Sequence, residues 1–100
     1  MTTALIADDE PVMLARIRNA LTEVWPELDV VAECRNGVAA LEAFHAHKPD
    51  VAFLDIRMPG MSGLETARAI ENRVASDAGQ TPARPPTVIM VTAYGKTDLL

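Results

Sequence analysis

The chain has 100 residues, of which 49% are hydrophobic and 23% charged, and its formal net charge at pH 7 is −5. This length favours one domain with a single core. The acidic balance argues against nucleic-acid binding through phosphates, and no apolar run approaches the roughly 18–20 residues that span a membrane. Cys34 is the only cysteine, so no internal disulfide is possible. A reducing cytoplasm is therefore the expected compartment, with Cys34 as a buried, inert thiol.

The first predicted strand is the apolar run 4–7, which is followed at once by acidic residues. Pro11 suits the first turn of a helix, because its missing N–H costs nothing there. An acceptor on Asp9 or Glu10 is expected to cap that helix. Trp25-Pro26 should end it, since the residue before proline is pushed out of the α region. The buried face is predicted from apolar residues at helical spacing, namely Met13, Ile17, Ala20, Leu21 and Val24.

Two more strands and a second helix follow. Residues 28–32 predict a short strand, and Asn36-Gly37 predicts a turn. A helix that stops before Pro49 comes next, and a third strand at 51–54 leads directly into Asp55. The second helix is expected to turn Val38, Leu41 and Phe44 inward.

The last third of the chain begins with a loop at 58–61. Ser62 and Glu65 have the spacing of a capping box, which predicts the start of a third helix. The proline-rich stretch 75–86 predicts a surface connector, and 87–91 predicts a fourth strand that ends at Thr92. The third helix is expected to bury Leu64, Ala67 and Ile70, and Thr97 to cap a further helix.

Alternating strands and helices predict a parallel sheet with helices on both faces and right-handed crossovers. Ligands of such sheets bind beyond the carboxyl ends of the strands. Asp8 and Asp9 follow the first strand and Asp55 follows the third, so we expect these carboxylates to share one crevice. Two carboxylates about 4 Å apart repel by roughly 1–4 kcal/mol, depending on the local dielectric. The sequence therefore predicts a hard cation between them.

Three segments together carry a resemblance to a known family: 8–11 (Asp-Asp-Glu-Pro), 53–65 (Phe-Leu-Asp-Ile-Arg-Met-Pro-Gly-Met-Ser-Gly-Leu-Glu) and 91–94 (Val-Thr-Ala-Tyr). The chain resembles the receiver domain of two-component response regulators. The last segment is similar to receivers attached to LytTR-type DNA-binding domains. The resemblance implies a flavodoxin-like, doubly wound α/β fold with strand order 2-1-3-4. It also implies that residues 1–100 form one receiver domain.

The resemblance also assigns roles to individual residues. Asp55 would be the phosphoacceptor, a carboxylate nucleophile that forms an acyl phosphate. Mg²⁺ would be held by Asp9, Asp55 and the backbone carbonyl of Arg57, with Asp8 bound through water. Thr92 would hydrogen-bond the phosphoryl group and swing inward as the switch, and Ala93 would leave room for that group.

The implied function is signal reception rather than enzymatic turnover. The protein would be cytoplasmic, a sensor histidine kinase would phosphorylate it on Asp55, and the resulting conformational change would control an output. That output is expected to be transcription, through a C-terminal DNA-binding domain outside this chain. We expect this segment neither to associate with a membrane nor to bind nucleic acid directly.

Receivers have a fifth strand, which begins with a lysine that pairs with the phosphoryl group, and a fifth helix. Both are missing from the 100 residues, and Lys96 does not match the position of that lysine. The sequence therefore predicts an incomplete receiver, in which phosphorylation is impaired because one positive charge is missing from the pocket. It also predicts self-association through the exposed fourth strand or fourth helix, because an unpaired sheet edge invites pairing with another chain.

Two functions from other classes are alternatives. One is a Mg²⁺-dependent phosphohydrolase with an aspartate nucleophile. Haloacid-dehalogenase-like enzymes of this kind need a second acid two residues after the nucleophile, and Arg57 occupies that position here. The other is a protein-interaction module that never uses phosphate.

Overall fold

Four parallel strands form the sheet of the computed structural model, which describes residues 1–76 and 87–91. The strand order is β2-β1-β3-β4, so the chain crosses from the second strand back over the first to reach the third. This is the predicted order, and the flavodoxin-like, doubly wound α/β fold is confirmed. The strands are β1 (Thr3–Ala7), β2 (Asp29–Cys34), β3 (Val51–Asp55) and β4 (Thr87–Val91).

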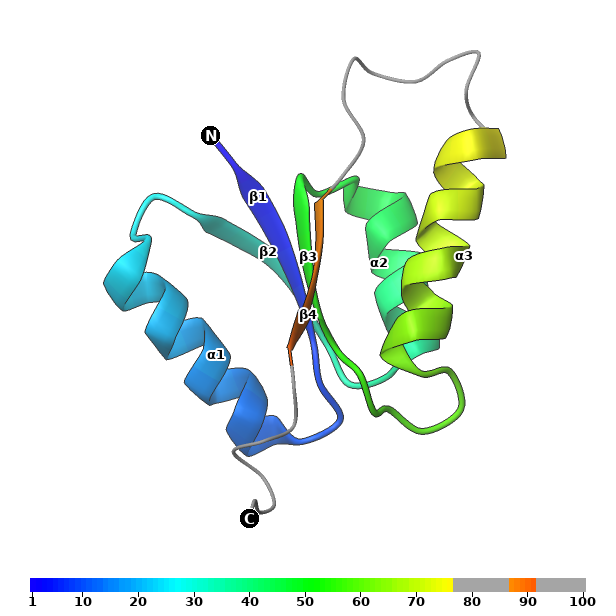
Figure 1. Cartoon of the computed structure of the whole chain (residues 1–100). Helices are drawn as coiled ribbons and strands as arrows, with labels where there is room; N and C mark the ends of the chain where they lie inside the picture. The colour runs from blue at the N-terminus through cyan, green and yellow to red at the C-terminus, as the bar shows by residue number, and fades with distance from the viewer. Residues whose placement is uncertain (77–86, 92–100) are drawn as a thin grey trace.

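Helices cover both faces of this sheet (Figure 1). The helix α1 (Pro11–Val24) lies against one face, and α2 (Gly37–His47) and α3 (Gly63–Ser76) lie side by side against the other. All three helices begin at the edge of the sheet where the strands end, because each helix directly follows a parallel strand. Among residues 1–76 and 87–91, no helix is both long enough and apolar enough to cross a membrane.

The core consists of two apolar layers, one on each face of β1 and β3. Side chains alternate between the faces along a strand, so Ala4 and Ile6 pack beneath α1 while Leu5 and Ala7 pack beneath α2 and α3. Burial of both faces explains why these two strands are continuous apolar runs in the sequence. The largest fully buried apolar side chains are Leu5, Ile6, Leu54 and Ile70.

The helix ends follow local sequence signals in most places. At the start of α3, the Ser62 N–H donates to Glu65 Oε1 at 2.9 Å and the Glu65 N–H donates to Ser62 Oγ at 3.1 Å, which confirms the capping box. Trp25 ends α1, as the following proline predicts. The expected cap on Glu10 is wrong: Glu10 occupies the N-cap position of α1 without a side-chain cap bond, and Asp8 Oδ1 accepts the Glu10 N–H at 2.9 Å.

Two apolar residues expected to face inward are instead exposed. Val38 is 55% exposed and Leu64 is 61% exposed. Each is the second residue of its helix, and the glycine before it, Gly37 or Gly63, takes the inward position of the first turn. One residue rotates the side chain by about 100°, so the valine and the leucine point away from the core. Ala40 and Thr66 continue the buried faces in their place.

The buried face of α1 also differs from the prediction. Leu14 is its one fully packed side chain among the described residues, and Met13, Ile17 and Leu21 are half-buried. Ala20 and Val24 are exposed, so their assignment to this face is wrong. Both lie in the second half of the helix, where Leu21 is the residue that packs against the core.

The remaining boundaries differ by a few residues. The second strand is β2 from Asp29 to Cys34, two residues longer at its end than the predicted 28–32. Residues 75 and 76 belong to α3 rather than to the connector. The rest of that connector, 77–86, and the predicted cap Thr97 lie outside the described residues.

Candidate metal and phosphoryl site

Asp8 and Asp55 lie at the carboxyl ends of the two central strands. The last paired residues of β1 and β3 are Ala7 and Leu54, so the next residue on each strand is one of these aspartates. Neighbouring residues of paired parallel strands point to the same face, which brings the two carboxylates together. Both side chains are fully buried.

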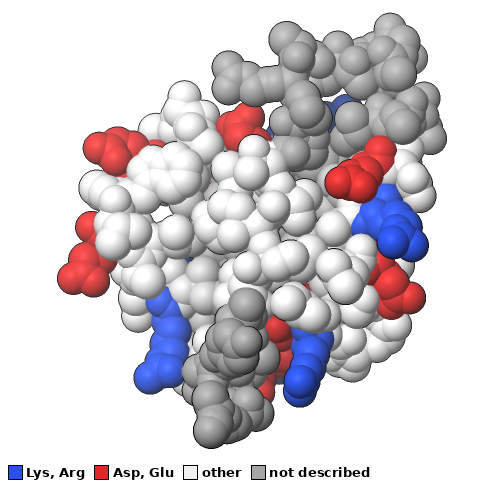
Figure 2. Space-filling model, viewed as in Figure 1, with Lys and Arg blue, Asp and Glu red and all other residues white. Residues whose placement is uncertain are grey.

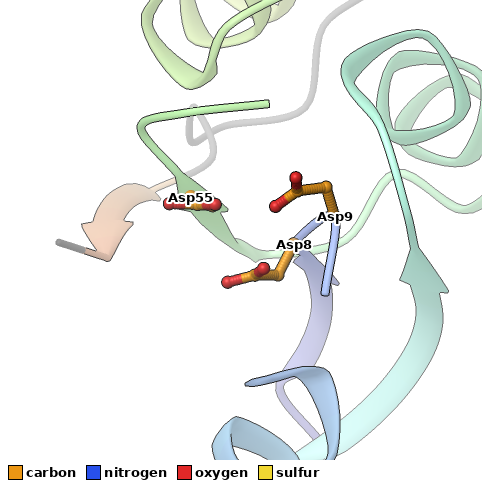
Figure 3. Close-up of side chains that lie close together, drawn as sticks. All are labelled: Asp8, Asp9 and Asp55. Atoms are coloured by element: carbon orange, nitrogen blue, oxygen red, sulfur yellow. The ribbon is translucent and has the colours of Figure 1, made fainter. Parts of the chain in front are cut away.

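Asp9 completes the cluster from the turn after β1. One carboxylate oxygen from each of Asp8, Asp9 and Asp55 lies within 4.8 Å of the other two. Figure 3 shows the three carboxylates around one shared space, with Asp8 and Asp9 on one side and Asp55 on the other. The structure therefore brings together the three predicted carboxylates from two separate strand ends.

Backbone contacts hold the β1 side of the cluster in place. The Asp8 N–H donates to the carbonyl of Cys34 at 3.0 Å, which ties the end of β1 to the end of β2. Asp8 Oδ1 also accepts the Glu10 N–H, so the turn folds back over its own carboxylate. On the β3 side, the Arg57 N–H reaches Asp55 Oδ1 at 3.4 Å, the upper limit of a hydrogen bond.

The donor set suits a hard divalent cation. Mg²⁺ prefers oxygen ligands at about 2.0–2.1 Å, takes few protein carboxylates and keeps several waters. Two oxygens on opposite sides of such an ion are about 4.2 Å apart, close to the 4.8 Å that bounds the three oxygens. Three carboxylates at these separations repel one another, and a cation between them would reverse the sign of that energy. The residues present therefore fit Mg²⁺.

Of the other predicted site residues, the structure describes only Arg57. Arg57 lies on the loop after β3 with its side chain exposed, beside Asp55 as its N–H contact shows. Thr92 and Ala93 lie outside the described residues. The last described residue before them, Val91, is the register partner of Asp55 on β4. The described part of the site is thus the cation side, formed by β1 and β3.

Sequence reasoning missed two features beside the carboxylates. The first is Arg35, whose Nε donates to the backbone carbonyl of Asp9 at 3.4 Å. The sequence could have indicated this contact, because Arg35 directly follows β2, and β2 ends at the same edge of the sheet as β1 and β3. The second is Gly63, whose backbone touches the carbonyl group of Asp55 so closely that no side chain fits between them. A glycine alone gave no signal for that contact.

Comparisons with a family model and with curated proteins point to the same family. The family model of the response regulator receiver domain matches residues 4–100. An uncharacterised response regulatory protein of Vibrio cholerae is 46% identical over 92 residues, which cover 92% of this chain and 32% of that protein. The transcriptional regulatory protein BtsR of Escherichia coli is 36% identical over 94 residues, 94% of this chain and 35% of its own. The chain thus spans about a third of the length of these relatives.

Solved structures agree in fold and family. The signal receiver domain of the response regulator NarL from Mycobacterium tuberculosis superimposes with a TM-score of 0.76 at 34% identity, covering 93% of this chain and 67% of that one. The response regulator TrrA from Thermotoga maritima, solved with Mg²⁺ and BeF, has a TM-score of 0.75 at 32% identity, covering 94% and 71%. This chain belongs to the response regulator receiver domain family.

Proposed function

We propose that this chain receives a signal as a phosphoryl group on Asp55, transferred from a sensor histidine kinase with the help of Mg²⁺. The observation that carries this proposal is the convergence of Asp8, Asp9 and Asp55 at the carboxyl edge of the sheet. Three carboxylates from two strand ends form the kind of oxygen donor set that a divalent cation needs beside a phosphoryl group. Membership of the receiver family supports the same function.

The proposed metal ligands are Asp9, Asp55 and the backbone carbonyl of Arg57, with Asp8 bound through a water molecule. When bound, Mg²⁺ would neutralise negative charge on the nucleophile and on the phosphoryl group. The Asp8 side chain is fixed by its bond from the Glu10 N–H, so it meets an ion without first having to be ordered.

The reaction itself is a phosphoryl exchange between two nucleophiles. A carboxylate oxygen of Asp55 attacks phosphorus, the new oxygen–phosphorus bond gives an acyl phosphate, and the phosphorus–nitrogen bond of the donor phosphohistidine breaks. Burial of Asp55 keeps bulk water away from the nucleophile. We further propose that Thr92 donates a hydrogen bond to the phosphoryl group and acts as the switch, and that Ala93 leaves space for that group.

The proposed output is control of transcription. Relatives such as BtsR are named as transcriptional regulatory proteins, and a structural neighbour from Staphylococcus aureus is described as a DNA-binding response regulator of the LuxR family. We propose that residues 1–100 lie within one receiver domain of a regulator that works in the cytoplasm with a C-terminal DNA-binding domain. Phosphorylation then biases a two-state element whose position the output domain reads.

Phosphorylation with a small-molecule donor tests this proposal. The protein is incubated with acetyl phosphate and Mg²⁺ and then weighed intact, beside Asp55→Asn and the matched charge-removing control Asp50→Asn, which lies at the other end of β3. We expect one phosphoryl adduct in the wild type and in Asp50→Asn, no adduct in Asp55→Asn, and none after chelation of Mg²⁺. An adduct that persists in Asp55→Asn would contradict the proposal.

The same experiment separates the alternatives. Catalytic release of phosphate without an adduct would favour the phosphohydrolase, and the complete absence of reaction would favour the interaction module. Arg57 in place of a second acid speaks against the phosphohydrolase. The family is one of signalling domains rather than a known enzyme family.

Self-association through β4 stays a prediction. In the described sheet β4 pairs only with β3, and Ile89 is 41% exposed. Figure 2 shows uncharged side chains over the middle of the face that contains β4, with charged side chains towards its margins. Light scattering over a concentration series tests the prediction, and a constant monomer mass would contradict it.

A further inference from the structure

The loop between β3 and α3, residues 56–62, connects the phosphoacceptor strand to a helix on the sheet's second face (Figure 1). It carries Arg57, whose carbonyl is a proposed metal ligand. At its far end, the Gly63 N–H donates to the carbonyl of Ile56 at 2.9 Å, which closes the loop into a compact turn. The position of this loop therefore decides where the carbonyl of Arg57 lies.

Gly63 is in contact with the backbone of the phosphoacceptor itself. A Cβ atom at this position would collide with the carbonyl oxygen of Asp55, and would lie 2.8 Å from the Asp55 carbonyl carbon and 2.9 Å from Ile56 Cα. Cβ atoms essentially never approach other heavy atoms this closely. The atoms in the way are backbone, which cannot rotate aside as a flexible side chain would. Any side chain at residue 63 therefore requires a shift between the start of α3 and the peptide unit that joins Asp55 to Ile56.

Gly37 holds the same loop from the other side. It is the first residue of α2, and a Cβ atom there would lie 2.7 Å from the carbonyl oxygen of Met61 and would collide with Thr66 Oγ1. Thr66 is fully buried, and its hydroxyl donates to the carbonyl of Ser62 at 2.8 Å. The start of α2 is thus seated directly on the end of the loop and on the first turn of α3.

The two halves of the carboxylate cluster have separate anchors. Asp8 is tied to β2 through Cys34, whereas Asp55 is followed by the loop that the glycines enclose. Arg57 lies in this loop and Asp55 directly precedes it, so a shift of the peptide unit after Asp55 would change the spacing between the donors on the β3 side and Asp8. Metal sites tolerate about 0.5 Å of such displacement.

We propose that Gly63 is a positioning residue for the metal and phosphoryl site, and that Gly37 supports it from α2. The close packing that the two glycines permit, because they have no side chain, sets the distance between the carboxylates of β1 and that of β3. This inference rests on the proposed function, since it concerns the same site. It means that the first residues of α3 and α2 contribute to metal affinity, although neither helix supplies a metal ligand.

Mg²⁺ binding to Gly63→Ala tests the proposal, with the dissociation constant measured by calorimetric titration of the full chain. Changes in residues that orient metal ligands cost about 10–100-fold in affinity, and we expect a weakening of about tenfold or more. Gly37→Ala should weaken binding in the same direction but less, because its collisions lie at the far end of the loop. If Gly63→Ala does not fold, Gly37→Ala carries the test alone.

Leu21→Ala is the control for a general loss of stability. Leu21 is a residue of α1 and packs against the core on the opposite face of the sheet from α2 and α3. It lies in the second half of the helix, away from the carboxylates. It should lower the midpoint of thermal unfolding and leave the Mg²⁺ dissociation constant within about twofold of the wild type.

Two results would overturn the inference. One is a folded Gly63→Ala protein with wild-type Mg²⁺ affinity, and the other is a Leu21→Ala protein that loses as much affinity as Gly63→Ala. If instead the wild type itself binds no Mg²⁺, the proposed function fails as a whole. The two failures are therefore distinguishable in one series of titrations.

Discussion

The two ends of β3 each carry an aspartate, and the two residues lie in opposite environments. Asp50, just before the strand, is exposed, and its Oδ2 accepts the Thr3 N–H at 2.9 Å and the Thr3 hydroxyl at 3.2 Å. Asp55, the last residue of the strand, is fully buried beside two further carboxylates. The first arrangement satisfies a charge that water also reaches, and the second concentrates charge away from water. The comparison separates an exposed aspartate that is bonded to the first strand from a buried aspartate that is gathered with two other carboxylates.

The largest expected effect comes from removing the charge of Asp55. In Asp55→Asn the side chain keeps an oxygen for the Arg57 N–H but no longer repels Asp8 and Asp9. We expect the free energy of unfolding without Mg²⁺ to rise by about 1–4 kcal/mol, the size of one such repulsion. Urea unfolding in the presence of a chelator measures it. A loss of stability would mean that Asp55 is a structural residue like Asp50.

At the other end of β3, we expect a substitution to change the free energy of unfolding in the opposite direction. Asp50→Ala removes two hydrogen bonds to Thr3 and should lower the free energy of unfolding by about 1 kcal/mol, since each is exposed. Phosphorylation by acetyl phosphate should continue at the wild-type rate. If it slowed as strongly as in a variant of the carboxylate cluster, the distinction between the two ends would fail.

The smallest effect concerns Cys34, the last residue of β2. Burial, and secondarily the charge of Glu33, raise the pKa of this thiol above its ordinary value. The native state therefore disfavours the thiolate: stability is unaffected below the ordinary thiol pKa and falls as the pH rises above it towards the raised value. Alkylation by iodoacetamide at pH 8 should be about tenfold or more slower in the native chain than in urea. Equal rates would contradict the assignment of Cys34 as an inert thiol.

The sequence predicted the central part of the fold well, because burial on both faces leaves a pattern that is visible in one dimension. The continuous apolar runs of β1 and β3 located Asp8, Asp9 and Asp55, and the order of parallel strands brought the three together. The capping box at Ser62 placed the start of α3 for a similar reason, since it is a local pattern of two residues.

The helix faces are harder to predict, because hydropathy periodicity detects only positions that carry large apolar side chains. Val38 and Leu64 were assigned to the core, whereas the positions that face inward are Gly37 and Gly63. Glycine has no side chain and therefore gives no hydropathy signal. The close packing of these two helix starts against neighbouring residues nevertheless requires glycine. The seating of the loop beside Asp55 depends on tertiary contacts that no local pattern encodes.

The central claim is that the carboxylates of two strand ends form one divalent-cation site. The most direct test is the free energy of unfolding with and without Mg²⁺, for the wild type and for Asp9→Asn. At a Mg²⁺ concentration about 100 times the dissociation constant, the wild type should gain about 2.7 kcal/mol, and Asp9→Asn should gain much less at the same concentration. A wild type that gains nothing, or an Asp9→Asn protein that gains as much as the wild type, would contradict the account.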